Sequence, residues 1–234
     1  SVYYTENHKK FRAVVRKFVE EELKPNVDKW IGKGYPRELH ERAYELGING
    51  LIYPREHGGT KPDDFDAFYE LILIDEIGRV TGFVMYQMQI NSMGLPPILY
   101  YGSDELKQKV CKDVISGKKN ICLAITEPYA GSDVAGIKAT AVREGDYYIV
   151  NGMKKWITGG TMGDFFTTAV RTGGEGAKGI SLLLIERGME GVSVRKMDTQ
   201  FDTTHSTTFV TLEDVKVPVK NLIGKEGEGF KMIV

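Results

Sequence analysis

One stretch of the chain, from Ile121 to Thr158, holds the densest group of residues that could form a binding site. These residues are Thr126, Glu127, Gly131, Ser132, Asp133, Trp156 and Thr158. Small and hydroxyl-bearing residues leave backbone N–H groups free to approach an anion or the edge of a ring. Trp156 lies two residues before Thr158, so a regular strand would place both side chains on one face, about 7 Å apart. The pattern predicts a wall for a flat aromatic ligand.

The elements that position these residues follow from local patterns. The apolar run 121–125 is typical of a buried strand, and the Pro, Gly, Ser and Asp residues of 126–136 indicate a loop. Segments 139–144 and 147–158 alternate like two strands, and the pair Gly145-Asp146 between them indicates a tight turn. We therefore expect a strand, a loop and a hairpin to form the site together.

Simpler interpretations exist for each of these residues. The loop from Thr126 to Asp133 is also compatible with an ordinary turn in which Asp133 caps a short helix. Trp156 is compatible with a core aromatic, and we expect it to be mostly buried in either case. Ser132 has no neighbouring base in the sequence that would make it a nucleophile. Segment 174–179 matches GxGxxG but lies between two strand patterns, which predicts a hairpin loop rather than a dinucleotide site.

The composition excludes several classes of protein. Lys plus Arg number 31 against 32 Asp plus Glu, without the basic excess that nucleic-acid or membrane-surface proteins usually carry. No apolar run approaches the ~20 residues that span a bilayer. The two cysteines provide no disulfide framework, and the four histidines show no metal-ligand spacing. We expect no nucleic-acid partner, no membrane span and no metal site.

The chain changes character near residue 120. Helical patterns dominate before it, with predicted helices at 11–23, 36–46, 63–79, 81–91 and 103–116. Strand patterns dominate after it, at 165–171, 180–186, 192–196 and 207–217. We predict an α-helical domain over 1–119, a β domain over 120–226, and the start of a further helix at 227–234. The predicted fold class is α+β.

Four motifs carry a family resemblance. Ala124 to Asp133 (AITEPYAGSD) resembles the TEPGAGSD motif of the acyl-CoA dehydrogenase family, and Asn151 to Thr158 resembles its NGxKxWIT segment. Glu213 to Pro218 is similar to the end of its FEDVxVP segment, with Leu212 in place of Phe, and Gly224 to Phe230 is similar to GxxGxGF. The motifs occur in the family's order and at similar spacing over nearly the whole chain.

The resemblance implies an architecture. Family members have an N-terminal helical domain, a middle β-barrel or β-sandwich domain and a C-terminal helical bundle, and the sequence resembles the first two. In the family the third domain supplies the catalytic glutamate and much of the contact to the adenine side of FAD across a subunit interface. We therefore expect this chain to be truncated before that bundle, and we assign no catalytic base to it. The family also implies a homo-oligomer, a dimer or tetramer, for the full-length protein.

The resemblance also implies a reaction, the FAD-dependent α,β-dehydrogenation of an acyl-CoA in fatty acid metabolism, with hydride transfer to flavin N5. Electron-transfer flavoprotein or another acceptor would take the electrons. The implied cofactor-binding residues are Leu123, Ile125, Thr126, Gly131, Ser132, Trp156, Ile157 and Thr158. Thr126 would donate to the flavin ring, Thr158 would bind near N5, and Trp156 would cover one edge of the ring. Ser132, Met85 and Gln89 are the implied substrate contacts. Compartments compatible with the family are mitochondrial, cytoplasmic or peroxisomal.

The sequence departs from the family pattern at several positions. Tyr129 stands where the family usually has Gly, and a bulky ring there would narrow or reshape the mouth near the cofactor. Segment 159–161 reads Gly-Gly-Thr where Asn-Gly-Gly is usual, and 201–207 matches poorly around Thr203. We read His205 in this segment as a solvated polar residue. The alternatives are an oxygen-using relative, either an acyl-CoA oxidase or a flavin monooxygenase, or a catalytically incompetent fragment or assembly protein.

Overall fold

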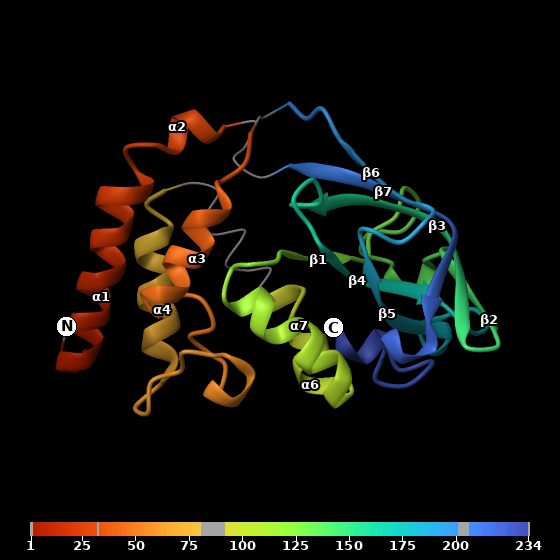
Figure 1. The fold of residues 1–234 in the computed structure, drawn as a ribbon, viewed down its shortest axis with the longest axis horizontal. Helices are drawn as coiled ribbons and strands as arrows, with labels where there is room; N and C mark the ends of the chain where they lie inside the picture. Colours follow the sequence, from red (N-terminus) through yellow and green to blue (C-terminus); the bar gives the residue numbers. More distant parts are fainter. Residues whose placement is uncertain (1, 32, 81–91, 201–205, 234) are drawn as a thin grey trace.

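A computed structural model describes residues 2–31, 33–80, 92–200 and 206–233, and a helical part precedes a β part along the chain (Figure 1). The α-helices are α1 (Glu6–Phe18), α2 (Val27–Trp30), α3 (Arg37–Glu45), α4 (Ala67–Ile77), α6 (Pro96–Tyr101) and α7 (Asp104–Ile115). A π-helical segment, Val19–Leu23, continues α1. Helices α6 and α7 lie between the first helices and the sheet.

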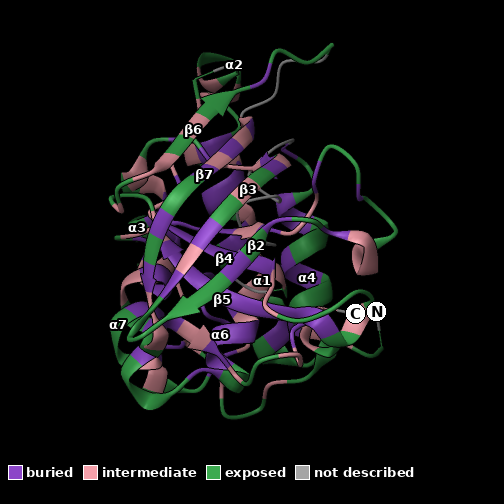
Figure 2. Cartoon of the chain, turned by 90° about the vertical axis from the view of Figure 1, so that its right-hand side faces the viewer, coloured by how far each residue is buried: buried purple, intermediate pink, exposed green. Residues whose placement is uncertain are grey.

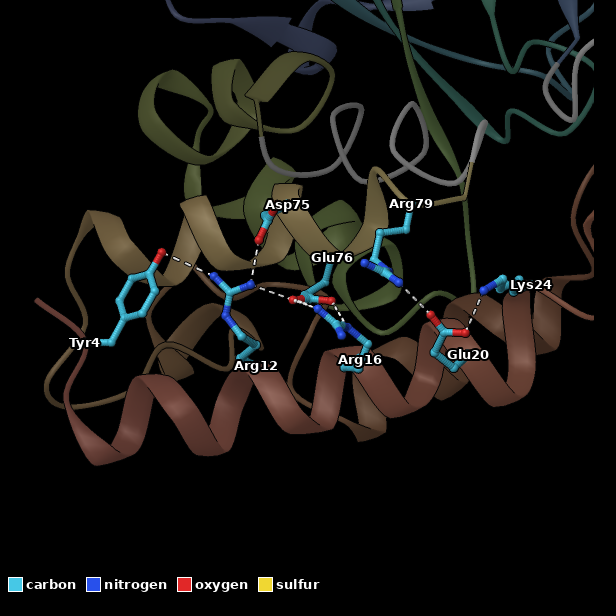
Figure 3. Close-up of polar contacts among 8 residues, drawn as sticks. All are labelled: Tyr4, Arg12, Arg16, Glu20, Lys24, Asp75, Glu76 and Arg79. Carbon is cyan, nitrogen blue, oxygen red and sulfur yellow. Dashed lines mark hydrogen bonds and ion pairs between the residues drawn. The ribbon is translucent and has the colours of Figure 1, made fainter. Parts of the chain in front are cut away.

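A buried carboxylate joins α1 to α4. Glu76 of α4 is fully buried, and it accepts hydrogen bonds from Arg12 (2.6 Å) and Arg16 (2.8 Å) of α1 (Figure 3). Burial raises the pKa of Glu76, but the hydrogen bonds from the two guanidinium groups outweigh this effect and hold the pKa below its usual value. The polar contacts extend along both helices to Tyr4, Glu20, Lys24, Asp75 and Arg79.

Most of the predicted helices form, with shifted ends. The side chain of Asp66 caps α4, which therefore starts four residues later than the predicted position 63. Ser103 caps α7 as the sequence indicates. Helix α6 is absent from our predictions because Pro96 and Pro97 suggest an interruption, although proline fits the first turn of a helix. The helix predicted over 81–91 lies outside the described residues.

The described strands form one eight-stranded sheet. They are β1 (Ile121–Ala124), β2 (Thr140–Glu144), β3 (Tyr147–Thr158), β4 (Phe165–Arg171), β5 (Ile180–Glu186), β6 (Val192–Lys196), β7 (Thr207–Pro218) and β8 (Leu222–Ile223). The order is β6-β7-β3-β2-β4-β5-β8, with β1 parallel to β4. The predicted hairpin at Gly145-Asp146 joins β2 to β3, and 172–179 is the predicted hairpin loop between β4 and β5.

Both faces of the central strands are covered. Strands β4 and β5 are buried along nearly their whole length, whereas β2 and β6 are largely exposed (Figure 2). One core cluster contains Val110 of α7, Leu99 of α6 and Leu182 of β5, so these helices pack on the sheet. A second cluster fills the other face with residues from β3, β4, β5 and β7. Both cysteines are buried and free.

The end of the described chain differs from the sequence expectation. A 3-10 turn at Phe230–Met232 stands where the patterns predict the beginning of an α-helix. This turn is attached to the sheet, because the Gly229 N–H donates to the Ile180 carbonyl at 2.8 Å. Phe230 and Met232 pack against the core cluster that α6 and α7 share with β5.

Candidate functional site

A single backbone hydrogen bond brings the loop after β1 against β3. The Lys155 N–H donates to the Thr126 carbonyl at 2.8 Å. Thr126 therefore lies beside Lys155, which precedes Trp156, although residues 126 and 155 are 29 positions apart in the sequence. Strand β1, which pairs with β4, also lies near β3. The loop and β3 therefore meet at Thr126 and Lys155.

A buried ion pair holds this junction together. Lys154 of β3 is fully buried, and its ammonium donates to Glu127 at 2.7 Å and to the Ile125 carbonyl at 3.0 Å. The Glu127 carboxylate also accepts the backbone N–H groups of Lys138 (2.6 Å) and Ala139 (3.0 Å). One carboxylate therefore fixes the start of the loop, its end and β3 to each other.

Burial has a direct electrostatic consequence for Lys154. Removal of its ammonium from water lowers the pKa to about 8, and the adjacent Glu127 carboxylate opposes this shift. The charged pair remains acceptable because the ammonium has two acceptors and the carboxylate has three donors. The pair is a positioning element rather than a reacting group, because it lies away from solvent.

Trp156 lies in a β-bulge and has a left-handed backbone conformation. The pairing of β3 with β7 shifts by one residue between Lys154 and Ile157, and Trp156 has φ of 65°. The regular alternation behind the expected 7 Å spacing to Thr158 is therefore broken here. Trp156 is 51% exposed, so it is not a core aromatic. A bulky residue at positive φ marks strain, which concentrates at binding sites.

The other predicted cofactor residues differ in exposure. Leu123, Ile125, Thr126 and Thr158 are half-buried, while Gly131 and Ser132 are exposed. The Ile157 side chain is buried in the core, which leaves only its backbone to face a ligand. Met85, Gln89, Thr203 and His205 lie outside the described residues. Asp133 precedes the 3-10 turn Val134–Gly136, but its side chain makes no capping hydrogen bond.

Two departures from the family pattern have a structural explanation. Gly159 has φ of 75°, a conformation that glycine adopts freely and that asparagine tolerates better than most residues. Glycine is therefore compatible with the backbone conformation at this position. The Tyr129 ring is 83% exposed and projects into solvent from the tip of its turn.

Arg171 joins the end of this loop to the hairpin loop between β4 and β5. Its guanidinium donates to the carbonyls of Ala135 (2.7 Å) and Ile137 (3.0 Å) on one side. It donates to those of Gly174 (2.5 Å) and Gly176 (3.1 Å) on the other. The two loops border an open cavity of about 530 Å³. Its lining includes Asp133, Lys138, Arg171 and Glu175.

Comparison with known proteins gives the family. The model of the acyl-CoA dehydrogenase N-terminal domain matches residues 5–118, and that of the middle domain matches residues 122–215. The chain belongs to the acyl-CoA dehydrogenase family. It is similar to acyl-CoA dehydrogenase apdG of Emericella nidulans, with 39% identity over 100% of this chain and 58% of that protein. It is 34% identical to caffeyl-CoA reductase-Etf complex subunit CarC of Acetobacterium woodii, over 98% of this chain and 61% of CarC.

Solved acyl-CoA dehydrogenase structures share the fold. A probable acyl-CoA dehydrogenase from Mycobacterium abscessus superposes with a TM-score of 0.90 at 38% identity, over 97% of this chain and 61% of that one. An acyl-CoA dehydrogenase complexed with FAD from Bacillus anthracis superposes with a TM-score of 0.90 at 29% identity. The match covers 99% of this chain and 40% of that one. The chain thus spans about three fifths of the length of the curated relatives named above.

Sequence reasoning did not find the partnership of Glu127 with Lys154, nor the role of Arg171. The sequence does contain a signal for the partnership of Glu127 with Lys154. Lys154 is an even number of positions along β3 from the buried Tyr148 and Val150, so regular alternation places it on their side of the strand. A lysine at an inward position requires a carboxylate partner, and Glu127 is a chemically suitable one. No comparable signal marks Arg171, whose partners are all backbone carbonyls.

Among the described residues, no group of three or more His, Cys, Asp or Glu side chains is arranged to bind a metal ion. Over the same residues, no helix combines the length and the apolarity that crossing a membrane requires.

Proposed function

We propose that the protein containing this chain is an FAD-dependent acyl-CoA dehydrogenase that oxidises an acyl-CoA between its α and β carbons. The observation that carries the proposal is the junction of Thr126 with the β3 bulge, fixed by the 2.8 Å hydrogen bond from Lys155. Half-buried threonines and a half-exposed Trp156 are suited to a planar, polar-edged ring such as the isoalloxazine. When bound, FAD supplies the acceptor for the hydride.

The residues of this chain would bind and orient the reactants. Thr126 and Thr158 would offer their hydroxyls to the edge of the ring, and Trp156 would cover it. The backbones of Leu123, Ile125 and Ile157 would border the ring, while Gly131 and Ser132 would contact the pyrophosphate and the CoA arm. Such preorganised donors stabilise developing negative charge, and they do so without rearrangement because Glu127 and Lys154 fix the loop. We assign the catalytic base to no residue of this chain.

The partners follow from the same proposal. We propose an acyl-CoA substrate and electron-transfer flavoprotein or another acceptor for the electrons, supported by a relative named as a subunit of an Etf complex. A homo-oligomer, dimer or tetramer, would complete the cofactor site, and Met85 and Gln89 remain proposed substrate contacts. The proposed domains are 1–119 and 120–226. A mitochondrial, cytoplasmic or peroxisomal location is compatible with this role.

Anaerobic mixing of the complete gene product with acyl-CoA thioesters of varied chain length tests the proposal. We expect the purified protein to carry about one FAD per chain and at least one thioester to bleach the flavin absorbance. An artificial electron acceptor should then restore the absorbance. Protein without flavin, or flavin that no thioester bleaches, contradicts the proposal. Rapid peroxide formation in air would instead assign the chain to the oxygen-using alternative.

A further inference from the structure

An exposed aromatic ring pairs with a lysine that lines the cavity beside Arg171. The Tyr129 ring is 83% exposed, and the Lys138 ammonium lies over it, 5.5 Å from the ring centroid. Lys138 also lines the 530 Å³ cavity together with Asp133 and Glu175. Lys138 therefore links two features: the cavity, which two carboxylates also line, and the exposed ring of Tyr129 beside it.

The pair is rigidly supported although it is exposed. Tyr129 stands in a tight turn in which Glu127 and Ala130 exchange backbone hydrogen bonds of 2.9 and 3.3 Å. The Lys138 backbone N–H donates to the buried Glu127 carboxylate at 2.6 Å. The backbone on both sides of the pair is thus anchored through Glu127, which Lys154 fixes in turn. A ligand that meets such a surface loses little free energy to ordering of the protein.

The chemistry of the rim selects the kind of ligand. An exposed tyrosine offers a face on which a nucleobase can stack, and an ammonium is a suitable contact for a phosphate. Carboxylates such as Asp133 and Glu175 accept hydrogen bonds from ribose hydroxyls or from an exocyclic amine. Ser132, our proposed contact for the CoA arm, lies between Tyr129 and Asp133 in the sequence. These groups together fit an adenosine phosphate.

We propose that Tyr129 and Lys138 form a docking platform for the adenosine phosphate end of the CoA thioester. The inference rests on the proposed function for its choice of substrate, and it adds two specificity-determining residues to that site. Tyr129 replaces the glycine usual in the resembling motif, so the platform distinguishes this chain from members with glycine there. FAD ends in the same adenosine phosphate, and the experiment must separate the two sources.

Calorimetric titration of the complete gene product with free CoA and with pantetheine tests the platform. Pantetheine lacks the nucleotide, so we expect the wild-type protein to bind CoA more tightly. Tyr129→Gly should weaken CoA binding roughly 5- to 100-fold, the range of a lost base–aromatic stack, and leave pantetheine binding unchanged. Lys138→Gln should weaken CoA binding by a smaller factor that grows at low salt. Tyr129→Phe should retain the affinity for CoA.

Matched controls separate the possible outcomes. Tyr147→Ala removes another exposed tyrosine, 47% exposed at the start of β3, and should leave CoA binding unchanged. Equal losses for CoA and pantetheine in Tyr129→Gly, or no loss for either, would overturn the platform. The platform would also be overturned if Tyr129→Gly lost affinity for FAD and kept its affinity for CoA. That result would assign the adenosine site to the cofactor. If the wild-type protein binds CoA no more tightly than pantetheine, the platform is overturned. The proposed function still holds in that case if thioesters bleach the flavin.

Discussion

Replacement of Glu127 by Gln should destabilise the fold by about 3–5 kcal/mol, the cost of leaving a buried charge without its partner. Lys154 is fully buried, and its ammonium would lose the negative charge that faces it at 2.7 Å. The amide would also turn either its oxygen or its NH₂ group toward the lysine, so the donors Lys138 and Ala139 could not all be satisfied. Urea unfolding at neutral pH measures the change in the free energy of unfolding.

Two variants make this prediction specific. Glu144→Gln changes an exposed glutamate of β2 and should alter the stability by no more than about 0.5 kcal/mol. The double variant Glu127→Leu with Lys154→Met removes both charges, so its loss should be smaller than that of Glu127→Gln alone. A loss below about 1 kcal/mol in Glu127→Gln would show that the pair does not hold the loop.

Thr158→Val should slow reduction of the bound flavin by an acyl-CoA by about 100-fold, the effect of removing one preorganised donor from a site where charge develops. Valine preserves the shape and the β-branch, so β3 should keep its pairing with Thr207. The flavin content should therefore stay near that of the wild type while the rate falls. Anaerobic stopped-flow absorbance measures this rate directly.

Thr211→Val is the matched control, because Thr211 lies on β7 opposite Met153, away from the end of β3. It should leave the reduction rate unchanged. A Thr158→Val protein that reduces its flavin within about threefold of the wild-type rate would remove Thr158 from the site. The proposed function would then rest on Thr126 and Trp156 alone.

Local signals in the sequence were sufficient for much of the fold. The turn at Gly145-Asp146 and the cap at Ser103 depend on a few neighbouring residues, and both occur as expected. The flanking strand patterns also predict that 174–179 is a hairpin loop and not a dinucleotide motif, and this prediction is confirmed by the pairing of β4 with β5. Helix α6 is absent from the predictions because two consecutive prolines usually indicate the end of a helix. In the structure Pro96 and Pro97 lie in the first turn of α6, where proline is compatible with a helix.

The site was less predictable because its geometry depends on contacts between distant segments. The bulge at Trp156 arises from the register of β3 against β7, which local periodicity does not encode. The partner of Lys154 is twenty-seven residues away, and that of Arg171 is a set of backbone carbonyls without a sequence signature. The placement of Thr158 near flavin N5 remains a proposal from the family resemblance.

A crystal structure of the complete gene product with FAD bound is the most direct test of the central claim. We predict that the hydroxyls of Thr126 and Thr158 both lie within hydrogen-bonding distance of one isoalloxazine ring, with the Trp156 indole against its edge. A flavin bound elsewhere, or a ring that one threonine contacts while the other faces a separate cavity, would contradict it.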